Sequence, residues 1–131
     1  MFLFTFWEQK NTRMTERTGP VSKPTAPHYT WASVCDGWRL IDTPGLSVVE
    51  ERVPPSAEEL RHYHNEARQF FYVLSGTAVL ETEGREHQIP AGSGIEVAPG
   101  VHHKFLNRSD QDVVFLVISA PSTKADRIDL E

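Results

Sequence analysis

Turn signals containing glycine or proline interrupt this sequence at short, regular intervals from about residue 29 onward. They include Asp36-Gly37, Pro44-Gly45, Ser75-Gly76, Glu83-Gly84, Ala91-Gly92 and Pro99-Gly100. The runs between them are short and rich in β-branched and aromatic residues, which is typical of strands. We therefore expect strands at 29–35, 38–42, 46–53, 59–64, 69–74, 77–82, 86–89, 94–98, 102–107 and 112–119. Many short strands with almost no helical signal predict an all-β sandwich or barrel.

Two of these predicted strands are apolar on both faces. In 69–74, Phe71 and Val73 share one face, and Phe70 and Leu74 share the other. The run 113–118 contains no polar residue at all. A strand of this kind needs apolar cover on both sides. One side can pack on the core and the other on a second subunit, so we expect a homodimer.

Net charge, cysteine content and hydropathy limit the partners and the compartment that we expect for this protein. Thirteen basic and eighteen acidic residues give a formal net charge of −5, which argues against nucleic acid as a partner. The single cysteine, Cys35, excludes an internal disulfide and fits a reducing compartment. The apolar run 2–7 is too short for a membrane span and lacks the basic residues that open a secretory signal. We expect a cytoplasmic protein with no membrane partner.

The composition and apolar periodicity of the sequence change near residue 28. Residues 8–28 are polar, contain three prolines and show no apolar period, as expected of an extended linker. We therefore expect a flexible N-terminal arm over residues 1–28 and one β-domain over residues 29–131.

Two of the six histidines lie two residues apart, at His62 and His64. On a strand, residues at this spacing project from the same face about 6–7 Å apart, so both imidazoles can reach one metal ion. Such an ion needs one or two further ligands from a neighbouring strand. A short His-x-His pattern also arises by chance, so the pattern alone does not establish a site.

The spacing around these histidines resembles the two conserved motifs of the cupin superfamily. His62-x-His64-x4-Gln69-x6-Gly76 is similar to the first motif, and Gly92-x5-Ala98-Pro99-Gly100-x2-His103-x3-Asn107 is similar to the second. The resemblance implies a double-stranded β-helix, the jelly-roll barrel of that family. It also implies one divalent metal ion (nickel, iron, manganese or zinc) held by His62, His64, Gln69 and His103. The sequence departs from the family pattern at Ala98, which replaces a proline, and at Gln69, which replaces a glutamate.

The glutamine bears on the expected chemistry. Its amide is neutral, so a divalent ion keeps its full charge and should favour an anionic or oxygen-rich ligand. We therefore favour a metal-dependent enzyme that uses Lewis-acid chemistry of the isomerase or lyase type on a small metabolite. Alternatives are an iron-dependent dioxygenase and a small-molecule-binding cupin without turnover.

Two further points concern the predicted pocket. Phe71 and Phe105 share faces with Gln69 and His103, so we expect them to line it.

The metal-ligand spacing is similar to that of small cupins that linearise unsaturated uronates, and Arg127-x-Asp129 matches part of their C-terminal pattern. The acid that this family carries before a proline is missing here at Pro121. The sequence identifies no proton-transferring residue.

Overall fold

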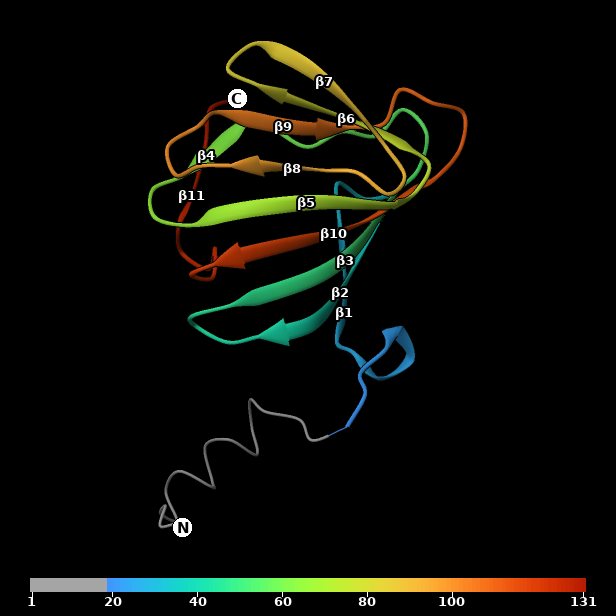
Figure 1. Ribbon diagram of the computed structural model, residues 1–131, viewed down its shortest axis with the longest axis vertical. Coiled ribbons are helices and arrows are strands. Elements are labelled where there is room, and N and C mark those ends of the chain that lie inside the picture. The colour runs from blue at the N-terminus through green and yellow to red at the C-terminus, as the bar shows by residue number, and fades with distance from the viewer. Residues whose placement is uncertain (1–18) are drawn as a thin grey trace.

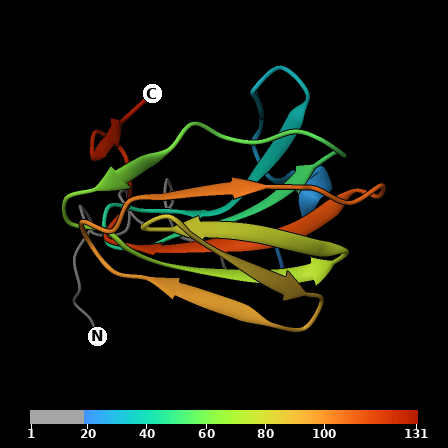
Figure 2. The same cartoon turned by 90° about the horizontal axis from the view of Figure 1, so that it is seen from above.

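Two antiparallel sheets face each other in the structure, a computed structural model that describes residues 19–131 (Figures 1 and 2). The six-stranded sheet contains, in spatial order, β1 (His28–Trp31), β2 (Cys35–Asp42), β3 (Ser47–Val53), β10 (Val113–Ala120), β5 (Arg68–Ser75) and β8 (Gly94–Val97). The five-stranded sheet contains β11 (Arg127–Asp129), β4 (His62–His64), β9 (His103–Leu106), β6 (Thr77–Thr82) and β7 (Arg85–Pro90). The sheets do not close into a continuous barrel, and they confirm the predicted all-β jelly-roll fold.

The core lies between the two sheets and is aromatic at its centre. Phe71, Phe105 and Phe115 stack there, with ring centroids 3.9 Å apart for Phe105 and Phe115 and 6.0 Å apart for Phe71 and Phe105. All three side chains are at most 4% exposed. Burying a side chain of this size contributes roughly 2–3 kcal/mol each, so this cluster is a main source of the fold's stability.

The outer face of β5 remains partly exposed in the single chain. Phe70 and Leu74 are 38% and 44% exposed, whereas Phe71 and Val73 on the inner face are buried. The alternation expected for this strand is therefore present, but only one face has cover within the described residues. The homodimer stays a prediction.

The first hairpin differs from the one expected from the sequence. Asp36-Gly37 lies inside β2, and the turn falls instead at Ala32 and Ser33, which adopt left-handed φ values of 49° and 69°. Gly37 is opposite Tyr29, and a Cβ at Gly37 would lie 2.2 Å from Cζ of the Tyr29 ring. The glycine thus makes room for an aromatic ring rather than for a turn.

One strand, β11, was not predicted from the sequence, and the predicted N-terminal arm is largely untested. Strand β11 is only three residues long, too short to give a periodic signal, yet it pairs with β4. Most of the arm predicted for residues 1–28 lies outside the described residues; its described end contains a 3-10 turn at Lys23–Thr25 before β1 begins. Across residues 19–131, no helix has the length and apolar character needed to cross a membrane.

Candidate metal centre

Three histidines converge on the inner side of the five-stranded sheet. His62 and His64 lie on β4, and His103 on β9 is the direct register partner of His62. Potential ligand atoms of all three lie within 4.8 Å of one another. The three side chains are buried, at 2%, 5% and 1% exposure. Strand alternation thus brings together His62 and His64, and the β4–β9 pairing adds His103.

Hydrogen bonds fix the orientation of each imidazole. The Nδ1 atoms of His62, His64 and His103 donate to the carbonyl oxygens of Leu60 (2.8 Å), Asp126 (3.3 Å) and Val101 (2.9 Å). An imidazole that donates through Nδ1 keeps a lone pair on Nε2, which is the usual arrangement of a metal-binding histidine. In agreement, Nε2 of His103 is buried and has no hydrogen-bond partner among the described residues.

The histidines are held in the neutral form that binds metal. Burial lowers the pKa of His62 to about 3 and that of His103 to about 4, and it also lowers the pKa of His64. The hydrogen bonds to backbone carbonyls raise the three pKa values, but by less than burial lowers them. A ligand that is already deprotonated at neutral pH releases no proton when a metal binds.

Gln69 offers a fourth ligand atom, an amide oxygen, on the same cavity. Its side chain is 6% exposed, and its Nε2 donates to Oγ of Ser119 at 3.1 Å. This bond turns Oε1 away from Ser119 and leaves it buried without a partner in the described part of the chain. Buried polar atoms are nearly always satisfied, so the unpartnered oxygen of Gln69 and nitrogen of His103 call for a ligand. Three imidazole nitrogens and one amide oxygen suit a divalent transition-metal ion.

A cavity of about 610 Å³ opens onto this cluster. Its lining includes His62, His64, Gln69 and Phe71. Phe105 is not among the lining residues; it packs behind the cavity against Phe115 in the core. The structure therefore places Phe71 at the predicted pocket and Phe105 in the interior.

Further polar and charged side chains line the cavity on both sheets. Tyr29, Arg39 and Glu51 reach it from the six-stranded sheet. Glu59 and Arg127 come from the segment before β4 and from β11. The motif resemblance had indicated Arg127 alone. The positions of the others follow from strand pairing and from the packing of one sheet on the other, which no local pattern in the sequence indicates.

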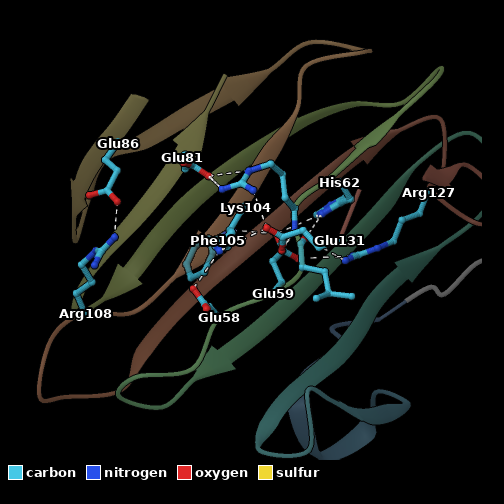
Figure 3. Close-up of polar contacts among 12 residues, drawn as sticks. Glu58, Glu59, His62, Glu81, Glu86, Lys104, Phe105, Arg108, Arg127 and Glu131 are labelled. Atoms are coloured by element: carbon cyan, nitrogen blue, oxygen red, sulfur yellow. Dashed lines mark hydrogen bonds and ion pairs between the residues drawn. The ribbon is translucent and has the colours of Figure 1, made fainter. Parts of the chain in front are cut away.

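Glu59 lies beside the histidine cluster, between His62 and Arg127 (Figure 3). One of its carboxylate oxygens accepts a hydrogen bond from the Phe105 amide at 3.1 Å and lies 3.9 Å from Nδ1 of His62. The other lies 3.6 Å from Nη1 of Arg127. Burial raises the pKa of Glu59 to about 8, and Arg127 opposes that shift. The neutral form of this carboxyl is therefore substantially populated at neutral pH.

The C-terminal segment holds the histidine strand in place. Strand β11 pairs with β4, and the Asp126 carboxylate accepts hydrogen bonds from the backbone amides of Asn65, Glu66 and Ala67, just after His64. On the other side, just before His62, Arg61 binds both Glu81 and Glu131 at 2.6 Å, which fastens the end of the chain to the same sheet. These contacts fix the backbone on both sides of His62 and His64.

Comparison with known sequences points to one family. A family model described as Cupin domain matches residues 49–119. The β-alanine degradation protein BauB of Pseudomonas aeruginosa is 36% identical over 78 residues, which make up 58% of this chain and 82% of BauB. The chain spans only 60% and 62% of two further curated relatives, from Methanocaldococcus jannaschii and Streptomyces halstedii.

Solved structures share the fold at low sequence identity. A double-stranded β-helix protein from Klebsiella pneumoniae has a TM-score of 0.74 at 21% identity, covering 88% of this chain and 99% of that one. A sugar phosphate isomerase from Silicibacter pomeroyi, described as a cupin, has a TM-score of 0.71 at 24% identity, covering 79% and 76% of the two chains. At these identities the likeness establishes the fold alone.

Proposed function

This chain belongs to the cupin family, and from that premise we propose that it is a metal-dependent enzyme acting on a small, oxygen-rich or anionic metabolite. His62, His64, His103 and Gln69 would hold one divalent ion. Such an ion supplies Lewis acidity, which polarises a carbonyl or carboxylate oxygen and suits isomerase- or lyase-type reactions.

The observation on which this proposal rests is the set of unsatisfied ligand atoms at the histidine cluster, of which His62, His64 and Gln69 line the cavity and His103 lies behind them. All three imidazoles donate through Nδ1 to backbone carbonyls, and the buried Nε2 of His103 and Oε1 of Gln69 have no partner within residues 19–131. If these groups served only to stabilise the fold, they would be paired with one another, because an unsatisfied buried polar group costs about 1–3 kcal/mol. Their arrangement therefore supports a binding role.

One cation of the cavity that is unpaired within residues 19–131, Arg39, supports an anionic or oxygen-rich ligand, in a lining that holds four carboxyl side chains and three cationic ones. Of the three cationic side chains in its lining, Lys124 pairs with Asp42 and Arg127 pairs with Asp129. Arg39 makes no ion pair with any carboxylate among the described residues, so its guanidinium is available to a ligand carboxylate or phosphate. The neutral amide of Gln69 leaves the bound ion its full charge, which acts in the same direction.

The low-identity isomerase from Silicibacter pomeroyi shows that this fold can host an isomerisation. That protein acts on a sugar phosphate, a ligand class whose adjacent oxygens suit a divalent ion and whose negative charge suits Arg39. We extend the reaction class to this chain as a proposal, and the substrate stays open.

Metal analysis of freshly purified protein tests the proposal directly. We expect about one equivalent of a divalent ion in the wild type and its loss in His103→Ala. The matched control is His102→Ala, because His102 stacks on Tyr63 and lies outside the cluster. If the wild type binds no metal at stoichiometric levels, the proposal fails.

The type of activity separates the remaining alternatives. A bound ion without redox activity, together with conversion of a carbonyl metabolite, supports the isomerase or lyase reaction. Iron with oxygen consumption would assign the chain to the dioxygenases, and saturable binding without product would make it a binding protein. Gln69→Glu should retain the metal but change the activity, because it lowers the charge of the site by one.

A further inference from the structure

Tyr29, Gly37 and Glu51 form a row across three neighbouring strands. Gly37 on β2 is the register partner of both Tyr29 on β1 and Glu51 on β3. Because Gly37 has no side chain, the Tyr29 ring lies over β2, in the space that a Cβ would occupy. The Tyr29 hydroxyl thereby reaches across β2 and donates a hydrogen bond to Oε2 of Glu51 at 2.5 Å. A residue larger than glycine at position 37 would prevent this contact.

Both members of the pair line the same cavity as His62, His64 and Gln69. Glu51 follows the inward alternation of β3, between the buried side chains of Val49 and Val53. Removing a carboxylate from water in this way is costly, and the Tyr29 hydroxyl offsets part of that cost. The fold brings it to the face of the cavity supplied by the six-stranded sheet, while the histidines occupy the face supplied by the five-stranded sheet.

The surroundings of Glu51 keep its two protonation states close in free energy. Burial raises the pKa of Glu51 to about 7, and the Tyr29 hydroxyl, Arg127 and Arg39 pull it downward. Glu59 and Cys35 are the other titratable groups coupled to it. The Arg39 guanidinium also packs on the Tyr29 ring, 4.4 Å from its centroid. A carboxyl of this kind can both accept and return a proton near neutral pH.

We propose that Glu51 is the general acid–base of this cavity and that Tyr29 is its positioning partner, a conclusion that rests on the proposed Lewis-acid function. In the forward step a substrate C–H bond adjacent to a carbonyl breaks, and an O–H bond forms on Glu51. The electron pair stays on the substrate as an enolate. Where the deprotonated carbon carries a hydroxyl, the product is an enediolate, and the hydroxyl proton passes to the former carbonyl oxygen. Glu51 then returns its proton to the former carbonyl carbon, and the other carbon–oxygen bond becomes the new carbonyl. The net reaction exchanges the carbonyl and hydroxyl positions and needs no oxidant or reductant. The three histidines cannot take this role, because each donates Nδ1–H to the backbone and presents Nε2 to the metal position.

A titration tests the pair without relying on activity. The metal-free protein, labelled with ¹³C at the glutamate side-chain carboxyls, is titrated by NMR, and the Glu51 signal is assigned by its absence in Glu51→Gln. We expect a midpoint near 7, well above the 4–5 of exposed glutamates. Tyr29→Phe and Gly37→Ala should both raise it, because each removes the hydrogen bond that stabilises the carboxylate. A midpoint below 5, or one that neither variant moves, overturns the inference.

A hydrogen-exchange measurement tests whether Glu51 transfers protons to and from a substrate carbon. The metal-loaded protein is incubated in D₂O with pyruvate, hydroxyacetone and dihydroxyacetone phosphate, and loss of C–H signal is followed by proton NMR. We expect Glu51→Gln to slow exchange about 100-fold or more and Tyr29→Phe about 10-fold, with a shifted pH profile. The control Glu50→Gln, on the outer face of β3 where it pairs with Lys23, should leave the rate unchanged.

The outcomes separate this inference from the proposed function. Absence of bound metal in the wild type would sink the proposed function and this inference with it. Bound metal with exchange that survives in Glu51→Gln at the wild-type rate would overturn this inference and leave the metal centre intact. Bound metal with no exchange of any of the three probes by the wild type would overturn it as well.

Discussion

Removal of the Asp126 carboxylate should loosen the strand that carries His62 and His64. In the structure this half-exposed side chain accepts hydrogen bonds from the amides of Asn65 (3.0 Å), Glu66 (3.2 Å) and Ala67 (3.0 Å). The backbone oxygen of the same residue accepts the Nδ1–H of His64 at 3.3 Å. Asp126→Ala therefore removes three charge-assisted hydrogen bonds from the turn that follows His64. The backbone hydrogen bond from His64 to residue 126 remains possible, but the carboxylate no longer holds residue 126 in place.

The expected cost follows from these contacts. A hydrogen bond to a charged group contributes about 1.5–3 kcal/mol when buried, and partial exposure reduces this to roughly 0.5–1 kcal/mol each. Three such bonds give a loss of about 2 kcal/mol in the free energy of unfolding. Groups that orient a metal-binding histidine typically change metal affinity about 10- to 100-fold, so we expect a loss of at least 10-fold. Burial raises the pKa of Asp126, but the three amides outweigh it and the pKa lies below its usual range. The stabilisation is thus present at neutral pH and is lost only as pH falls through that lowered pKa.

Urea unfolding of the metal-free protein and competitive zinc titration measure the two effects separately. Asp126→Asn should lie between the wild type and Asp126→Ala, because it keeps an acceptor without the charge. Asp110→Ala is a suitable control, since Asp110 is exposed and its side chain makes no hydrogen bond or ion pair within residues 19–131. If Asp126→Ala unfolds within 0.5 kcal/mol of the wild type and binds zinc with the same Kd, the role assigned to the C-terminal segment is wrong.

Three further predictions follow from the same structure. Asn107→Ala should lower the free energy of unfolding by about 3 kcal/mol in urea, because Asn107 is 1% exposed and bonds to Val53 (3.0 Å), Gln111 (2.7 Å) and Ser109 (2.9 Å); a loss below 1 kcal/mol would contradict this. Since burial holds the pKa of His62 at about 3 and that of His103 at about 4, and lowers that of His64, zinc affinity should fall less than about 10-fold between pH 7.5 and 5.5, whereas three ordinary imidazoles would lose about 1000-fold; competition titrations across this range decide between the two. If the outer face of β5 is a subunit interface, Phe70→Glu with Leu74→Glu should convert a dimer to a monomer in light scattering, and a wild-type monomer would refute the predicted homodimer.

The β-architecture could be read from the sequence because its signals are local. Alternation within 69–74 correctly separated buried Phe71 and Val73 from Phe70 and Leu74, and the turn signals located most strand ends. The Asp36-Gly37 signal failed because a distant residue, Tyr29, determines why that glycine is needed. Local propensity describes what a segment can form, but here the cross-strand neighbour decided what it did form.

In the candidate site, too, some residues could be predicted from local sequence patterns and others could not. The i, i+2 spacing of His62 and His64 by itself placed both imidazoles on one face, and the motif resemblance suggested that Gln69 and His103 belong with them. The positions of Glu51 and Glu59 at the cavity, and of Asp126 at the turn after His64, depended on strand register and on the packing of one sheet over the other. Sequence periodicity records the direction in which a side chain points from its own strand. Which distant side chains it meets is decided by long-range pairing, and that is fixed only when the whole core is assembled.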